Sequence, residues 1–319
     1  MLGEFVPREQ SAILAARARR QPQHLLEFEP DVVRSSYNLR PFLIHHHLCE
    51  HTGFSLDALS ALCRRLPRGQ VQYRVGAIPG DAHFDSSYAR YGEGLHFDDV
   101  LEHFEERKAY ICIYNPERDA GYRPVLEGLL AEIAAAIEGI DPVITWYSTY
   151  VFISTRDAVT PYHMDREMNF LLQVRGAKEV MLWDPHDDEI MSPADKDRLL
   201  AAFKSRRPTY SPSFEAKAMH YELRPGLGVH HPFIAPHRVH TGPELPISLA
   251  LTFRTRKSDM WTSAHAFNNV MRSCGWSPAE VGALHPYADR AKAAAAHAMD
   301  VPLALLRKRR HAHSAAENT

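Results

Sequence analysis

The stretch TPYHMDREMNFLLQVRGAKEVMLWDP, residues 160–185, combines a His-x-Asp pair with two strand-like runs. The runs are Met168–Val174 and Ala177–Trp183, and the two residues between them end in Gly176. Because glycine adopts the positive φ that a two-residue hairpin turn requires, the pattern predicts two antiparallel strands joined by a tight turn.

Lys178 is the unusual residue of this predicted hairpin. In that register it lies directly opposite Gln173 and shares a face with Leu171 and Val180. A lysine on an inner, apolar face costs free energy unless it meets an anion, and a dicarboxylate cosubstrate would provide one. The alternative is that this face is turned to solvent, since both faces of the hairpin are largely apolar.

Strand-like runs continue on both sides of the hairpin. Val143–Ser154, Gly228–Ile234 and Ile247–Phe253 are rich in β-branched and aromatic residues, and turn residues separate them. Short strands without intervening helices predict a sandwich or barrel and argue against a parallel α/β sheet. We therefore expect a mainly β catalytic core over residues 143–257.

Helical patterns flank this core. We expect residues 1–142 to form an α/β elaboration of the barrel and residues 258–319 a helical C-terminal segment. The expected helices are Glu9–Arg20, Ser55–Leu66, Phe97–Arg107, Tyr122–Ile137, Asp259–Arg272, Ser277–Ala283 and Tyr287–Arg310. The expected N-terminal strands are Arg40–His46, Val71–Val75 and Ala109–Tyr114.

Bulk composition argues against several classes of protein. The 319 residues are 45% hydrophobic and 24% charged, and 37 Lys and Arg against 39 Asp and Glu give a net charge of -2. No global field therefore favours nucleic acid or an anionic membrane, and no apolar run is long enough to span a bilayer. The four cysteines form no CxxC pair and no secretory signal is visible, so we expect a cytoplasmic protein without a disulfide framework.

The His-x-Asp pair is a candidate metal site. Alternate residues of an extended chain point to the same side, so His163 and Asp165 can reach one metal ion together. A later strand must supply a second histidine, and we favour His237, which closes an extended run, with His240 as the rival. The segment VHHPFIAPHRVHTG offers four candidates in all: His230, His231, His237 and His240. With 20 histidines in the chain, a hydrogen-bonded surface turn is the alternative explanation of the pair.

Such a site has a specific chemical use. Two histidines and one carboxylate leave three coordination positions of a metal open, which a non-haem Fe(II) oxygenase requires for its cosubstrate and O2.

Residues 160–185 and the PG…P…PH segment at 225–237 resemble the JmjC/cupin-like Fe(II)- and 2-oxoglutarate-dependent oxygenases, in particular the asparaginyl hydroxylase of hypoxia-inducible factor. The shared pattern is a threonine three residues before the histidine, His-x-Asp, and then Asn-Phe, Gln, Gly and Lys at the same spacings. The resemblance covers about 155–256 well and the N-terminal part weakly. It implies a cupin-like, double-stranded β-helix (jelly-roll) core that uses Fe(II), 2-oxoglutarate and O2.

For the metal, the resemblance implies that His163, Asp165 and His237 are the iron ligands. It also implies decarboxylation of 2-oxoglutarate to succinate and CO2, coupled to hydroxylation of an unactivated C–H bond in a protein or peptide side chain. A small-molecule substrate, such as an amino acid or a natural-product intermediate, is the alternative. A cupin-like metal-binding protein without catalysis is a further alternative, and a retained dicarboxylate anchor argues against it.

For the cosubstrate, the resemblance implies that Lys178 pairs with the distal carboxylate of 2-oxoglutarate and that Thr160 donates its hydroxyl to the same group. Asn169 would line the cosubstrate pocket, and Tyr110 matches a family tyrosine only loosely. Many other 2-oxoglutarate oxygenases use an arginine after the second histidine, which makes Arg254 the rival anchor.

The C-terminal helical segment has apolar residues at roughly helical spacing. These residues are Met260, Trp261, Phe267, Val270 and Met271. Spacing alone indicates packing against the barrel, whereas the resemblance implies a homodimer interface.

Overall fold

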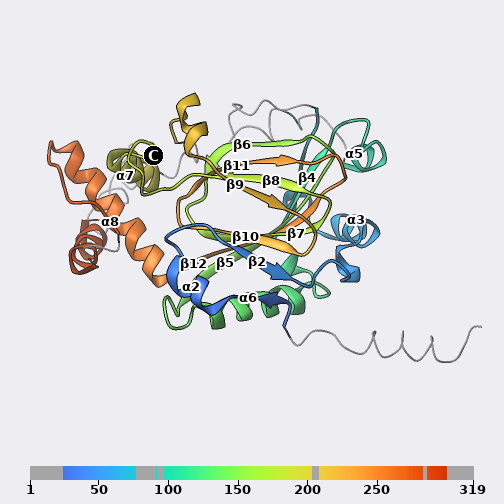
Figure 1. The fold of residues 1–319 in the computed structure, drawn as a ribbon, viewed down its shortest axis with the longest axis horizontal. Helices are drawn as coiled ribbons and strands as arrows, with labels where there is room; N and C mark the ends of the chain where they lie inside the picture. Colours follow the sequence, from blue (N-terminus) through green and yellow to red (C-terminus); the bar gives the residue numbers. More distant parts are fainter. Residues whose placement is uncertain (1–23, 77–90, 92–96, 203–207, 283–285, 300–319) are drawn as a thin grey trace, which may run out of the picture.

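The computed structural model describes residues 24–76, 91, 97–202, 208–282 and 286–299. Its centre is a pair of facing antiparallel sheets (Figure 1). In the described residues the larger sheet has eight strands in the order β1-β2-β10-β7-β12-β5-β4-β3, and the smaller sheet has four in the order β6-β11-β8-β9. The central strands are β5 (Ile144–Ser154), β6 (Val159–Met164), β7 (Met168–Arg175), β8 (Lys178–Leu182), β9 (Met219–Leu223), β10 (Leu227–His231), β11 (Pro236–Thr241) and β12 (Ile247–Thr255).

From β5 to β12 the chain changes sheet at each step except between β8 and β9, which are neighbours in the smaller sheet. Strands β5, β7, β10 and β12 lie in the larger sheet, and β6, β8, β9 and β11 form the smaller one. The pairings among them are antiparallel. This arrangement is a double-stranded β-helix, so the predicted mainly β, jelly-roll core with added helices is confirmed.

The predicted hairpin between β7 and β8 is wrong. Strand β7 pairs with β10 and β12, whereas β8 pairs with β9 and β11 in the other sheet. Lys178 therefore lies beside Leu223 and Thr241, not opposite Gln173. Gly176 does have the expected positive φ, +64°, but its turn carries the chain from one sheet to the other. A Cβ at Gly176 would lie 2.9 Å from the carbonyl oxygen of Leu245, so the sharp crossing requires glycine there.

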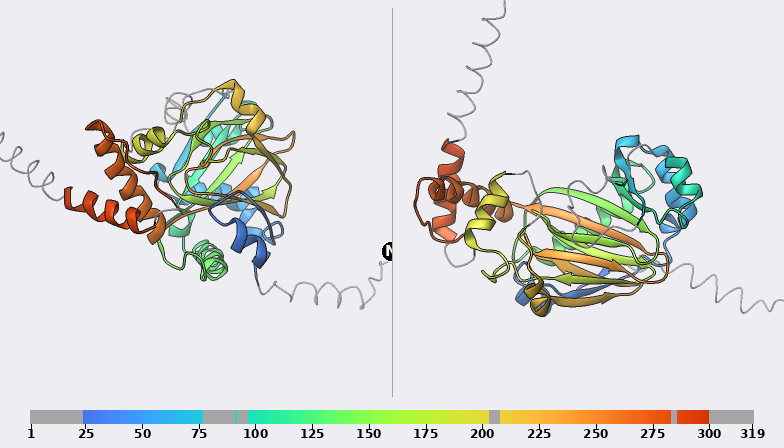
Figure 2. Two further views of the ribbon diagram at one scale, coloured as in Figure 1. Left: turned by 60° about the vertical axis from the view of Figure 1, so that its left-hand side comes forward. Right: turned by 90° about the horizontal axis from the view of Figure 1, so that it is seen from above.

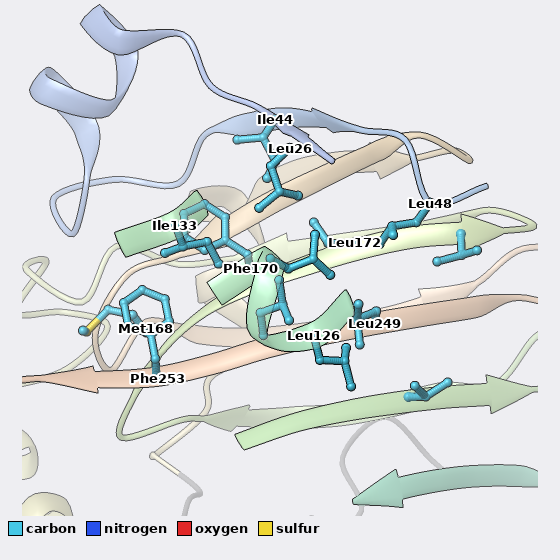
Figure 3. Close-up of a cluster of buried hydrophobic side chains, with 14 of the residues drawn as sticks. Leu26, Ile44, Leu48, Leu126, Ile133, Met168, Phe170, Leu172, Leu249 and Phe253 are labelled. Carbon is cyan, nitrogen blue, oxygen red and sulfur yellow. The ribbon is translucent and has the colours of Figure 1, made fainter. Parts of the chain in front are cut away.

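The two faces of β7 belong to different hydrophobic clusters. Leu171 packs with Val180 and Leu182 between the sheets, as the predicted division of faces requires. Phe170 and Leu172 point to the outside of the larger sheet and join the main core. Figure 3 shows Phe170, Leu172, Leu249 and Phe253 gathered around Leu126 and Ile133 of helix α6 (Arg123–Ile137). The larger sheet is thus covered on its outer face, and the space between the sheets is left for a site.

N-terminal elements extend the larger sheet and cover it. Their strands are β1 (Leu26–Glu27), β2 (Leu43–His46), β3 (Val71–Arg74) and β4 (Tyr110–Tyr114), and their helices are α2 (Pro30–Ser36), α3 (Leu56–Arg65), α5 (Phe97–Glu102) and α6. The helix predicted at Ser55–Leu66 is confirmed, and Ser55 caps it by accepting from the backbone N–H of Ala58. The helix predicted at Phe97–Arg107 ends early, at Glu102. The helix predicted at Glu9–Arg20 lies outside the described residues.

Helices α7 (Pro193–Ala202) and α8 (Arg256–Ser273) pack together at one end of the sandwich, opposite α3 and α5 (Figure 2). A further helix covers residues 286–299 and agrees with the described part of the one predicted at Tyr287–Arg310. The short helix predicted at Ser277–Ala283 is wrong over the described residues 277–282, whose backbone is not helical, and the side chains of Asn268 and Lys292 donate to the carbonyl of Ala279 there. Within the described residues, no helix is both long and apolar enough to cross a lipid bilayer.

A buried carboxylate joins α7 to α8. His265 Nδ1 donates to one oxygen of Asp197 at 2.6 Å, and Arg272 Nε donates to the other at 2.7 Å. Asp197 is 1% exposed, so loss of its carboxylate would leave two polar groups unsatisfied in a dry region.

We expect Asp197→Ala to destabilise the protein by about 3 kcal/mol, because removing the carboxylate leaves the side chains of His265 and Arg272 buried without their ionic partner. Urea unfolding followed by tryptophan fluorescence measures the change. The control is Asp31→Ala, since Asp31 and its partner Arg34 form a surface ion pair and its loss should cost under about 0.5 kcal/mol. Equal stabilities for the two variants would contradict the role of this link.

Candidate metal and cosubstrate site

Three metal-ligating side chains meet at one end of the space between the sheets. His163 on β6 is paired in register with His237 on β11, and Asp165 lies just beyond the end of β6. One donor atom from each lies within 4.8 Å of the others, and His237 Nε2 is 3.9 Å from Asp165 Oδ2. Among the described residues, His163, Asp165 and His237 form the one cluster of three or more His, Cys, Asp or Glu side chains with donor atoms close enough to hold a metal ion.

The backbone sets the orientation of both histidines. His163 Nδ1 donates to the carbonyl of Pro161 at 2.8 Å, and His237 Nδ1 donates to the carbonyl of Ala235 at 3.1 Å. With the proton on Nδ1, Nε2 carries the lone pair that a metal ion requires. Both rings are buried, 5% and 4% exposed, so their geometry is held by the surrounding strands. The donor set therefore fits a divalent metal ion.

The other histidines considered from the sequence do not join this group. His240 is three residues beyond His237 but lies outside the cavity, next to Glu179 in register. His230 faces the outer core, where its ring stacks on Tyr37 and its Nε2 accepts from the backbone N–H of Asn38. Burial lowers the pKa of His230 to about 3, so this ring is a neutral core residue.

The triad opens into a cavity of about 400 Å³ that runs between the two sheets. Leu171, Val239 and Ala250 give it apolar walls, while Lys178 lies among its lining residues. A volume of this size is within the range of small-molecule sites.

Lys178 is the buried cation of the cavity. Its residue is 3% exposed, and its Nζ lies 5.6 Å from the centre of the Phe152 ring. Burial is the main cause that lowers the pKa of Lys178 to about 7, and the charge of Arg74 lowers it further. No carboxylate forms an ion pair with Lys178 in the part of the chain that the structure describes. The predicted inward orientation is confirmed, and a lysine in this position is suited to bind an anion that enters the cavity.

The remaining predicted cosubstrate residues also line the cavity. Thr160 lies on β6 and Tyr110 on β4, and their hydroxyl oxygens are 3.3 Å apart, which links the two sheets. Asn169 lies on β7, and its Oδ1 accepts from the hydroxyl of Thr252 at 3.4 Å. The structure therefore gathers Thr160, Tyr110, Asn169 and Lys178 around one space.

Arg254, the rival anchor, is not part of this site. Its guanidinium lies 3.6 Å from a carboxylate oxygen of Asp259 and 4.8 Å from the centre of the Trp146 ring. Neither Arg254 nor these neighbours line the cavity.

Thr252 and His231 are polar residues of the cavity that the sequence did not assign to cosubstrate binding. Thr252 lines the cavity, and its position was available from the alternation in ISLALTF, which puts Ser248, Ala250 and Thr252 on one face. His231 also lines the cavity beside the triad, although the sequence suggested it only as a metal ligand. Burial lowers the pKa of His231 well below its ordinary value, so its ring is neutral.

The model of one protein family, the cupin-like domain, matches residues 85–258, more than half of the 319-residue chain. The chain belongs to the cupin-like domain family. The matched range contains the triad together with Lys178, Thr160, Asn169 and Tyr110, so the cupin-like domain carries the whole site described above.

Solved structures of the ribosomal oxygenase YcfD from Escherichia coli are similar to this cupin-like chain. One is 15% identical with a TM-score of 0.47, and covers 88% of this chain and 68% of its own. A complex of YcfD with cobalt and 2-oxoglutarate is 14% identical with a TM-score of 0.48, and the match covers 83% of this chain and 63% of the YcfD chain. A complex of YcfD with cobalt and succinic acid is 14% identical with a TM-score of 0.44, and the match covers 88% of this chain and 68% of the YcfD chain. The chain thus spans about two thirds of the YcfD chains, and no curated protein matches its sequence.

Proposed function

We propose that this protein is an Fe(II)- and 2-oxoglutarate-dependent oxygenase that hydroxylates an unactivated C–H bond of a protein or peptide side chain. One observation carries the proposal: a triad of two histidines and a carboxylate shares a cavity with a buried lysine that needs an anion. A bare metal-binding cupin has no use for such a cation, because a buried ammonium without a partner is destabilising.

Fe(II) suits the triad, since two imidazoles and one carboxylate on one face leave three positions for other ligands. His163, Asp165 and His237 would hold it. When bound, iron with 2-oxoglutarate and O2 supplies the oxidising power that inserts one oxygen atom into the C–H bond, and the cosubstrate leaves as succinate and CO2.

The chain's own residues bind and orient the cosubstrate. Lys178 forms an ion pair with its distal carboxylate, and the hydroxyl of Thr160 donates to the same group. Tyr110 holds Thr160 in place through the contact between their hydroxyls. Asn169 lines the cavity near the metal, and the apolar walls exclude water that would compete for these bonds.

The substrate would enter beside Gln72, Tyr114, Tyr150 and Glu167, which line the cavity and are partly exposed. These side chains can hydrogen-bond to a peptide, and the cavity is large enough for a side chain and not for a folded segment. A small molecule that uses the same polar groups is the alternative substrate.

The test is release of succinate from 2-oxoglutarate by the purified protein with Fe(II), ascorbate and air. We expect succinate release that a metal chelator abolishes. A peptide substrate should stimulate the release and should gain the mass of one oxygen atom. A screen of peptides and metabolites separates the two substrate classes. Absence of 2-oxoglutarate consumption under all of these conditions would refute the proposal.

Homodimerisation through the C-terminal helices stays a prediction. The described residues in this region include exposed apolar side chains, Val270, Trp276 and Tyr287, at 41%, 71% and 82% exposure. Sedimentation velocity of the full chain would detect a dimer.

A further inference from the structure

A row of polar side chains crosses the larger sheet at the metal end of the cavity. His231 on β10 is paired in register with Asn169 on β7, and Asn169 is paired in turn with Thr252 on β12. All three line the cavity. The ring of His231 also meets the ring of His237 edge to face, with centroids 4.6 Å apart and planes at 72°. His231 therefore lies beside the metal triad, but on the opposite sheet.

His231 has no hydrogen-bond partner among the described residues. Neither Nδ1 nor Nε2 has a partner, and the residue is 3% exposed. The neighbouring rings differ, since His163, His237 and His230 each donate Nδ1–H to a backbone carbonyl. A buried imidazole with two unsatisfied nitrogens is costly, and native structures seldom retain one without a reason. A molecule in the cavity would supply the missing partner.

The position of His231 in the cavity restricts which bound group could be its hydrogen-bond partner. His231 is not in the group whose donor atoms lie within 4.8 Å of one another, so it does not complete the triad as a further ligand. The distal end of the cavity already has Lys178 and Thr160 as donors. At the metal end, Asn169 uses its Oδ1 to accept from Thr252, which leaves its amide Nδ2 as a donor. An anion that spans the cavity needs donors at both ends.

We infer that His231 is a positioning residue that donates an N–H to the carboxylate next to the keto group of a 2-oxo acid bound at the metal. The inference rests on the proposed function and extends it. It assigns to His231 the binding of the carboxylate at the keto end of the cosubstrate, whereas Lys178 binds the distal carboxylate. The donor stands on the larger sheet and the metal on the smaller one, so the bond also fixes the cosubstrate between them.

The test separates metal binding from cosubstrate binding, and uses His231→Phe with Co(II) in place of iron. Calorimetric titration should give a Co(II) Kd within about threefold of the wild-type value, because His231 is not a ligand. The Kd of the Co(II)-loaded protein for 2-oxoglutarate should rise roughly 10- to 100-fold, the effect of losing one hydrogen bond to a charged group. His231→Gln, which retains an N–H donor, should recover part of the loss. His240→Phe, the same change outside the cavity, should have no effect.

A second ligand locates the bond. 2-Oxobutyrate has the keto-acid end and lacks the distal carboxylate. Its affinity should fall in His231→Phe as much as that of 2-oxoglutarate does, and should be unaffected by Lys178→Met. An unchanged affinity of His231→Phe for 2-oxobutyrate would place His231 away from the keto-acid end and overturn the inference.

The failures are distinguishable. If the Co(II)-loaded wild-type protein does not bind 2-oxoglutarate, the proposed function is wrong. If it binds 2-oxoglutarate and His231→Phe binds it equally well, only the role of His231 is wrong. If Co(II) affinity collapses in a folded His231→Phe, His231 is a metal ligand and the inference is again overturned. Circular dichroism of both variants verifies folding.

Discussion

Replacing Asp165 by alanine is expected to reduce metal-dependent consumption of 2-oxoglutarate by roughly a thousandfold or more. Asp165 supplies the only carboxylate of the triad in the described residues, and its loss removes both a ligand and the negative charge that balances the metal. A bound metal stabilises the transition state by several kcal/mol, and each 1.4 kcal/mol that is lost lowers the rate about tenfold. Succinate release under saturating Fe(II) measures the effect, and Co(II) titration shows whether metal binding is lost.

The matched control for this change is Asp98→Ala. Asp98 is 85% exposed in α5 and pairs only loosely with Arg64, at 3.8 Å. The Asp98→Ala substitution should leave the turnover of 2-oxoglutarate unchanged. His163→Ala and His237→Ala should behave like Asp165→Ala, whereas His240→Ala should not. Full turnover in Asp165→Ala would remove the basis for an iron centre here.

Replacing Lys178 by methionine is expected to raise the KM for 2-oxoglutarate by about 100- to 1000-fold. The variant keeps the length of the side chain and removes the charge, so the distal carboxylate is left buried without its partner, which costs about 3–4 kcal/mol at about 1.4 kcal/mol per tenfold. Steady-state kinetics with varied 2-oxoglutarate measures this. Arg254→Met is the control, because Arg254 lies outside the cavity. A raised KM in Arg254→Met with none in Lys178→Met would reverse the assignment of the anchor.

The same lysine gives a pH dependence of binding. Its pKa is about 7 in the free protein. A bound carboxylate favours the ammonium and raises that pKa, so binding takes up a proton above neutral pH. Affinity should be constant below about pH 7 and then fall as pH rises, by at most roughly tenfold per unit. Lys178→Arg keeps its charge throughout and should show no such decline.

Lys178→Met should also stabilise the protein in the absence of cosubstrate. Burial lowers the pKa of Lys178 to about 7, which means that the folded state disfavours the ammonium by a few kcal/mol near neutral pH. Methionine is an apolar chain of similar size and removes this cost. Thermal unfolding of both proteins without ligand measures the difference, and the gain should vanish when wild-type protein is saturated with 2-oxoglutarate.

Local patterns in the sequence predicted much of the site, and strand pairing was where they failed. Alternation placed Lys178 on the face of Val180 and Leu182, and this is correct because side-chain direction depends on backbone period alone. The hairpin was wrong because a glycine turn also allows the chain to cross to another sheet, and here β7 pairs with β12 while β8 pairs with β11.

Other elements lacked a readable signal. Strand β9, MHYEL, and strand β11, PHRVHT, contain few β-branched residues, and their pairing with β8 is what makes them strands. Helix α7, PADKDRLLAA, has too few apolar positions for a clear helical stripe. The contact of Tyr110 with Thr160 joins residues 50 positions apart in different sheets, and no local spacing encodes it.

The triad, Thr160 and Lys178 all belong to the four-stranded sheet or its immediate continuation, whereas Asn169, Thr252, His231 and Tyr110 belong to the eight-stranded one. The three metal ligands therefore depend on one sheet alone, whereas a molecule that fills the cavity contacts both sheets. A change that loosens the packing between the sheets should leave the relative positions of the ligands intact and weaken the contacts that His231, Asn169 and Tyr110 make with such a molecule.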